Sequence, residues 1–185
     1  MIKRFYPLII SPLVFVCACS TDNGEWRTKV QDADCLHKSV KHVTDVIVHD
    51  IFSPPVASRI YVYMSVAAYE AARYQDSSYV SLAGQLHGLE PVPDPEAGVE
   101  YCYPLAATQA VLQVGKALVF SEDKMEAFYE PMMQKFRDAG VPEDVFERSV
   151  AYGAKVAEHV LAWSSKDNYK QSRSFPKYSI LEDPA

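Results

Sequence analysis

Apolar and polar residues follow a helical period along most of the chain, from about residue 36 to residue 168. Apolar side chains recur every three or four positions, which is the spacing of one buried helix face. We find no run of strict alternation and no hairpin signal of the kind that marks paired strands. The pattern therefore predicts an all-α protein of about five helices.

The clearest of these helices runs from Ser53 to Arg73. Ser53 is expected to cap the first turn through its side chain, and Pro54 and Pro55 suit positions where a missing N–H costs nothing. Alanines at positions 67, 68, 71 and 72 leave a low surface that another helix can approach closely. We expect a central helix whose buried positions are Ile60, Tyr63, Met64, Ala67 and Ala71.

The other helices are expected before and after this one in the sequence. They are Leu36–Phe52 with Ile51 as its last apolar position, Tyr103–Phe120, Ser121–Gly140 and Pro142–Trp163. Pro131 should kink or split the third of them, and Gly140 should close it as a left-handed cap.

A long irregular segment, from about Gln75 to Gly98, separates two of the helices. Alternate prolines at 91, 93 and 95 exclude helix and sheet there. Leu82, Leu86 and Leu89 indicate that part of the segment packs down on the bundle. A connection of this length is usually a functional loop or a wrap around the domain.

Residues 1–18 have the features of a secretory signal peptide. Lys3 and Arg4 precede a mostly apolar run that is too short to span a bilayer. Ala18 followed by Cys19 resembles a bacterial lipobox, so we expect Cys19 to be lipidated and to anchor the chain in a membrane. Ordinary cleavage without lipidation is the alternative. Ser20 is not an aspartate of the inner-membrane retention type, which favours an outer-membrane lipoprotein of the cell envelope, facing the periplasm or the surface.

Residues 19–35 are expected to tether this anchor to one helical domain at 36–168. Trp26 is an exception within the polar tether and is expected to dock on the domain. Without residues 1–18 the chain has 16 Lys and Arg against 24 Asp and Glu, a formal charge of −8. This balance argues against a nucleic-acid partner, because no basic patch is available to neutralise phosphates.

Two cysteines remain once Cys17 is removed with the signal peptide and Cys19 is acylated. They are Cys35 and Cys102, and each begins an expected helix. An oxidising compartment permits a disulfide between them. We predict this pairing, although the sequence does not show that the two residues lie close together.

Histidines do not form a convincing site. His42, Asp45 and His49 share a helix face, but the two histidines are seven residues apart, whereas helical zinc sites usually place them four apart. A polar helix face explains these residues better, so we predict no metal site in this chain.

Two stretches carry a family resemblance. Pro54-Pro55-Val56-Ala57-Ser58-Arg59, followed by Ala67-Ala68-Tyr69-Glu70-Ala71, resembles the early helix of bacterial vanadium-dependent haloperoxidases, which share a superfamily with type-2 phosphatidic acid phosphatases. Gly153-Ala154-Lys155-Val156-Ala157-Glu158-His159-Val160-Leu161 resembles another helix of these families. The resemblance implies the first half of a haloperoxidase-like helical bundle.

The catalytic motifs of the superfamily do not occur in the sequence. They are Lys-x6-Arg-Pro, Pro-Ser-Gly-His and Ser-Arg-x5-His-x3-Asp, which surround a phosphate or vanadate with cationic donors and two histidines. Ser58-Arg59 has serine where the histidine should stand, and Lys166 and Arg173 have the motif spacing but no following proline. We therefore predict no catalytic residue here, and vanadate only for a complete family member.

Two functions remain open. The chain is either the N-terminal supporting half of an envelope phosphatase or haloperoxidase-like protein, or a free-standing helical periplasmic lipoprotein that binds or scaffolds. Residues 169–185 resemble a connection between helices that has been cut, so a C-terminal catalytic half or second subunit is the expected partner.

Overall fold

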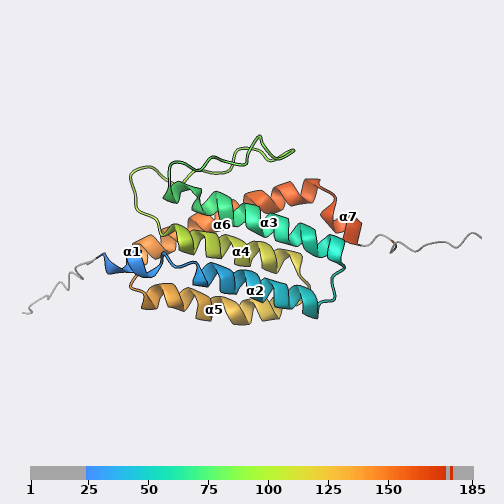
Figure 1. Cartoon of the computed structure of the whole chain (residues 1–185), viewed down its shortest axis with the longest axis horizontal. Coiled ribbons are helices and arrows are strands. Elements are labelled where there is room, and N and C mark those ends of the chain that lie inside the picture. The colour runs from blue at the N-terminus through green and yellow to red at the C-terminus, as the bar shows by residue number, and fades with distance from the viewer. Residues whose placement is uncertain (1–23, 174–175, 177–185) are drawn as a thin grey trace, which may run out of the picture.

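The computed structural model describes residues 24–173 and residue 176. Over these residues the chain forms α-helices joined by loops and contains no strand, which confirms the all-α prediction (Figure 1). The elements are α1 (Glu25–Lys29), α2 (Asp34–His49), α3 (Pro54–Ala72), the short 3-10 helix η1 (Arg73–Gln75), α4 (Tyr103–Leu118), α5 (Glu122–Asp138), α6 (Glu143–Lys166) and α7 (Tyr169–Arg173).

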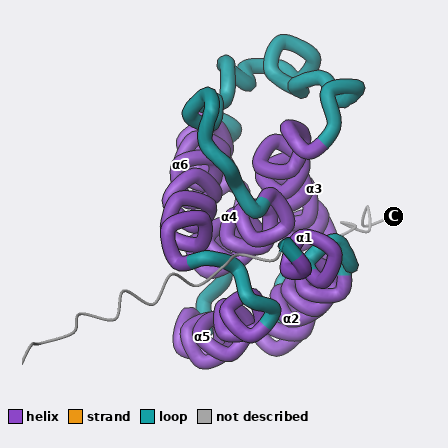
Figure 2. The backbone as a smooth tube through the Cα atoms, turned by 90° about the vertical axis from the view of Figure 1, so that its left-hand side faces the viewer, coloured by secondary structure: helices purple, strands orange, loops and turns teal. Residues whose placement is uncertain are grey.

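Helix α4, not α3, occupies the middle of the bundle. It contacts α2, α3, α5 and α6, which lie around it (Figure 2). Small residues bring these neighbours close: a Cβ on Gly153 of α6 would lie 2.3 Å from the carbonyl oxygen of Ala106, and one on Gly115 would lie 2.7 Å from Val43 Cγ2 of α2. The expectation that 53–73 is the central helix was therefore wrong, and α3 forms one wall of the bundle.

Helix α3 buries the face that its sequence predicted. Ile60, Tyr63, Met64, Ala67 and Ala71 are all buried.

The start of α3 differs from the expectation. Ser53 is the N-cap residue, but its side chain makes no capping hydrogen bond. The first two helical positions are Pro54 and Pro55, which have no N–H to offer, and the amide of Val56 donates to the Ser53 carbonyl oxygen at 3.0 Å. No amide of the first turn is therefore left for the Ser53 hydroxyl to cap.

Two other helix predictions need correction. Ile51 was expected on the buried face of the preceding helix, but α2 ends at His49 and Ile51 is 88% exposed with φ 55°. Pro131 does not split α5, which continues from Glu122 to Asp138. Pro131 is exposed, and so is Ala127, whose carbonyl group loses its helical donor and can bind water instead. Gly140 has φ 91° and closes this helix as predicted.

The segments outside the main helices pack against the bundle. Residues 76–102 arch over α3 and α6 (Figures 1 and 2), and Leu89 within this loop is buried. Helix α1 lies in the stretch assigned to the tether, and Trp26 docks as expected, with 4% of its surface exposed. None of the described helices has the length and apolarity needed to cross a bilayer. The predicted signal peptide and Cys19 lie outside the described residues.

Candidate functional site

The two cysteines at the α1 end of the bundle are free thiols in the structure. Burial raises the pKa of the Cys102 thiol to about 11, and a negative charge on Cys35 would raise it further, which indicates that the two residues are near neighbours. Burial also raises the pKa of Cys35. Both thiols are therefore protonated at neutral pH. The Cys35–Cys102 pairing stays a prediction.

The histidines of α2 face different surroundings. His42 stacks on Phe128 of α5 with a ring separation of 4.0 Å, and its Nε2 contacts the carbonyl oxygen of Lys124 at 3.1 Å. Asp45 is bound by Lys41 at 2.7 Å. The described residues contain no group of three His, Cys, Asp or Glu side chains that could hold a metal ion.

Arg59 ties the start of α3 to the end of α6. Its Nη2 donates to Asp167 Oδ2 at 2.9 Å, and the Tyr63 hydroxyl donates to the same oxygen at 2.6 Å. The rings of Trp163 and Tyr169 meet the Tyr63 ring edge-on, with centroids at 5.6 and 5.8 Å. Burial and the bond to Asp167 raise the pKa of Tyr63 to about 12, so the phenol remains protonated. Arg59 of the haloperoxidase-like motif therefore has a structural role in this chain, since it connects α3 to the end of α6.

Glu70, the acid of the second motif, holds the long loop on the bundle. Its carboxylate is fully buried, and Oε1 accepts from the amide of Leu82 at 2.6 Å. The Ser81 hydroxyl lies 3.1 Å from both carboxylate oxygens, and Arg73 Nε donates to Oε2 at 3.0 Å. Every donor comes from the loop or from the turn that leads into it. Glu70 is therefore positioned to order residues 76–102.

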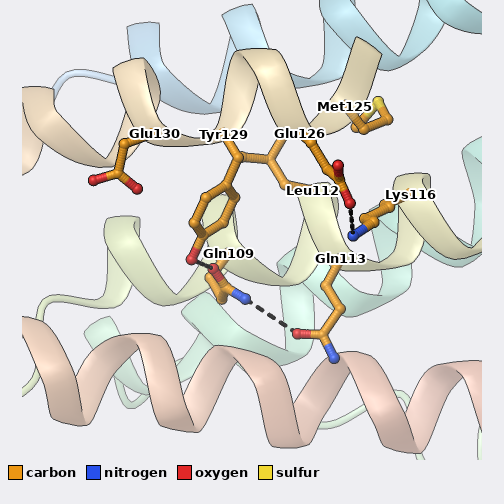
Figure 3. Close-up of a pocket in the computed structure, with 8 residues that line it drawn as sticks. All are labelled: Gln109, Leu112, Gln113, Lys116, Met125, Glu126, Tyr129 and Glu130. Carbon is orange, nitrogen blue, oxygen red and sulfur yellow. Dashed lines mark hydrogen bonds and ion pairs between the residues drawn. The ribbon is translucent and has the colours of Figure 1, made fainter. Parts of the chain in front are cut away.

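A polar groove lies between α4 and α5 and has a volume of about 410 Å³ (Figure 3). The Tyr129 hydroxyl donates to Gln109 Oε1 at 2.7 Å, and Gln109 Nε2 donates to Gln113 Oε1 at 3.1 Å. Lys116 at one side is paired with Glu126 at 2.7 Å. Since the only lysine of the lining is neutralised, the groove suits a small uncharged polar ligand better than an anion.

Comparison with solved structures gives a match that agrees with this architecture. A crystal structure described as the first bacterial vanadium-dependent iodoperoxidase is 43% identical in sequence, with a TM-score of 0.71 over 78% of this chain. This chain is a partial haloperoxidase-like protein. It spans 35% of the length of the iodoperoxidase chain. Profiles of known protein families give no match, and neither does the comparison with curated proteins.

The described residues of this haloperoxidase-like chain do not fit a vanadate or phosphate site. Such an oxyanion needs several cationic donors that converge on it. Each arginine whose side chain the structure describes is instead bound to a carboxylate. The pairs are Arg27–Glu100, Arg59–Asp167, Arg73–Glu70, Arg137–Glu143 and Arg148–Asp144.

The Lys-x6-Arg pair gives no support for such a site either. Lys166 is exposed at the end of α6, and the side chain of Arg173 lies outside the described residues. The chain shares the scaffold of the haloperoxidase over the matched part, and its described residues do not build the oxyanion centre.

The sequence identified Arg59 and Glu70 only as members of the family motif and did not predict their contacts. It gave no sign that Asp167 would take part. Asp167 lies 108 positions from Arg59, in a polar stretch that carries no pattern of its own. The one usable signal was that Glu70 stands among apolar residues at the end of the helix and that Arg73 follows three residues later, since a buried acid needs a partner.

Proposed function

We propose that this chain is the N-terminal supporting part of an envelope phosphatase or haloperoxidase-like protein whose oxyanion site lies in residues outside it. The observation that carries the proposal is the 43% identity over a third of an iodoperoxidase fold, at a TM-score of 0.71. The described arginines are paired with carboxylates, which also supports an oxyanion site outside this chain. The packed helices α3, α4 and α6 would then support the catalytic part of the protein.

A chimaera tests the proposal directly. The segment of the iodoperoxidase that matches this chain would be replaced by the corresponding residues of this chain, with the rest of the enzyme unchanged. We expect a folded protein that oxidises iodide with hydrogen peroxide when vanadate is supplied. The unmodified iodoperoxidase is the positive control, and the same enzyme without the matched segment is the negative control. A chimaera that folds but has no activity above the negative control would refute the proposal.

The chain by itself should be inactive. Purified residues 20–185 are expected to hydrolyse an aryl phosphate no faster than buffer, because nearly the whole set of preorganised donors is missing and the loss of one alone costs roughly a hundredfold in rate. Turnover that disappears in Lys166→Ala and Arg173→Ala would contradict this expectation and place the site in this chain.

The location in the cell envelope rests on the N-terminal sequence. The apolar run, Ala18 and the polar residues after Cys19 support a lipid anchor and a periplasmic or surface-facing domain. A fatty-acid probe fed to cells should label the wild type and not Cys19→Ala. Equal labelling of both would exclude lipidation at Cys19 and favour ordinary signal cleavage.

A free-standing lipoprotein that binds a ligand is the second candidate, and the groove of Figure 3 is the observation that favours it. The groove has the volume of a small-molecule site, and its floor of Gln109, Gln113 and Tyr129 can exchange hydrogen bonds with a polar ligand. A chimaera that folds but is inactive would favour this candidate.

A further inference from the structure

The groove between α4 and α5 contains a buried amide. Helix α4 buries mostly apolar residues, but Gln109 is polar and has only 7% of its surface exposed. Burial of an amide is costly unless hydrogen bonds replace those made to water. Both hydrogen-bond partners of the Gln109 side chain, Tyr129 and Gln113, line the same groove (Figure 3). Apolar side chains would join the two helices equally well, so the fold by itself does not call for a polar network here.

The hydrogen bonds of this network all run in one direction. Burial and the negative charge of Glu130 raise the pKa of Tyr129, so its hydroxyl stays protonated and donates to Gln109 Oε1 at 2.7 Å. Gln109 Nε2 then donates to Gln113 Oε1 at 3.1 Å. The amide nitrogen of Gln113 ends the network, and it has no partner among the residues that the structure describes. The groove therefore offers N–H donors at the Gln113 end.

A hydrogen-bond acceptor lies at the other end of the network, beside Tyr129. Figure 3 places the Glu130 carboxylate on this side of the groove, away from the free amide. The ion pair of Glu130 is long, since Arg137 Nη1 lies 3.7 Å from Glu130 Oε1, which is too far for a hydrogen bond. Glu126, the other acid of the lining, is already bonded to Lys116 at 2.7 Å. Within the described part of the chain, Glu130 is therefore the carboxylate of this groove that is open to a new donor.

The groove also has an apolar part and a net negative charge. Leu112 of α4 and Met125 of α5 line it and are almost fully buried. The charged residues of the lining are two acids, Glu126 and Glu130, and one lysine, Lys116, so its formal charge is −1. This charge disfavours an anionic ligand. A ligand that fits has an acceptor for the free amide, a donor for the free carboxylate and a short apolar group.

We propose that this groove binds a small neutral amide that carries a short aliphatic group. The carbonyl oxygen of the ligand accepts a hydrogen bond from Gln113 Nε2, its N–H donates to the Glu130 carboxylate, and its aliphatic group packs on Leu112. The inference rests on the second candidate function, ligand binding in the groove, and names the class of ligand. It does not depend on where an oxyanion site lies.

Two probes of the same shape test the proposal. Isovaleramide and isovalerate share the aliphatic group, and one has an amide where the other has a carboxylate. Each is titrated into the purified chain, and the side-chain amide signals of Gln109 and Gln113 are followed by heteronuclear NMR. For a ligand of this size we expect a dissociation constant on the order of 1 mM for isovaleramide. Isovalerate should bind at least about tenfold more weakly, because it is repelled by Glu130 and has no N–H to donate.

Two substitutions test the two ends of the groove. Gln113→Leu removes the free donor and should weaken the binding of isovaleramide about fivefold, which the Gln109 signal reports. Glu130→Gln replaces the carboxylate by an amide, which should weaken isovaleramide about tenfold and strengthen isovalerate. Gln134→Leu and Glu147→Gln change exposed positions outside the groove and should alter neither affinity.

Three results would overturn the proposal. The first is equal binding of the two probes, or no change in the Gln109 and Gln113 signals at about ten times the expected dissociation constant. The second is a shift of these signals with protein concentration when no probe is present, because a second copy of the chain would then fill the groove. The third is wild-type affinity in both Gln113→Leu and Glu130→Gln. The supporting role is tested by the activity of the chimaera and the ligand class by these titrations, so either can fail without the other.

Discussion

Removal of the Glu70 carboxylate should release the long loop from the bundle. Glu70 is fully buried, and it accepts hydrogen bonds from Leu82, Ser81 and Arg73. In Glu70→Ala, the Leu82 amide and the Ser81 hydroxyl lose their acceptor in a place that water reaches poorly. Arg73 keeps other partners, because its Nη2 also donates to the Tyr74 hydroxyl at 2.5 Å.

The size of the loss in the free energy of unfolding follows from these contacts. Removal of one partner of a buried charged pair typically costs about 3–5 kcal/mol. We expect the lower end of this range, about 3 kcal/mol, since Arg73 is not left without a partner. Glu70→Gln keeps one acceptor oxygen for the Leu82 amide but loses the charge opposite Arg73, so about 1.5 kcal/mol is expected. Arg73→Ala combined with Glu70→Ala should cost less than the sum of the single changes, because the two groups interact directly.

Two assays separate local from global effects. Urea unfolding followed by circular dichroism gives the free energy of unfolding, and brief chymotrypsin treatment reports whether residues 76–102 open, since the loop contains Tyr79 and several leucines. Glu147→Ala, at an exposed position of α6, is the control and should stay within about 0.5 kcal/mol of wild type. A Glu70→Ala protein with wild-type stability and wild-type cleavage of the loop would refute the reasoning.

Three further predictions concern packing, pH and the thiols. Gly153→Ala should destabilise the bundle by about 3 kcal/mol in urea unfolding, because the new methyl group would overlap the Ala106 carbonyl oxygen at 2.3 Å; a change below 1 kcal/mol would mean that the helices can separate easily. The folded protein holds the Tyr63 proton more tightly than the unfolded chain does, so this group should stabilise the fold fully below pH about 10, and the stabilisation should be lost as the pH rises through about 12. The free energy of unfolding of Tyr63→Phe, measured against pH, should lack this fall between about pH 10 and 12. Thiol counting in denaturant should find no free thiol on Cys35 or Cys102 in protein from an oxidising compartment, whereas two reactive thiols would rule out their disulfide.

The amino-acid sequence by itself determined where the helices lie. Apolar spacing located α2 to α6 within a few residues, because each helix must bury one face and that face repeats every three to four positions. The prolines before Val56 and the glycine at 140 marked a helix start and a helix end for equally local reasons.

Only the tertiary structure decided which helix is central and what the charged residues do. Gly153 and Ala106 meet across α6 and α4, and Arg59 meets Asp167 across 108 positions, so no local pattern could reveal either contact. Ile51 matched the apolar period of α2 but falls just after the helix ends, where a left-handed turn directs it into solvent. Periodicity describes one helix at a time, whereas burial, ion pairing and exposed surface depend on which elements pack together.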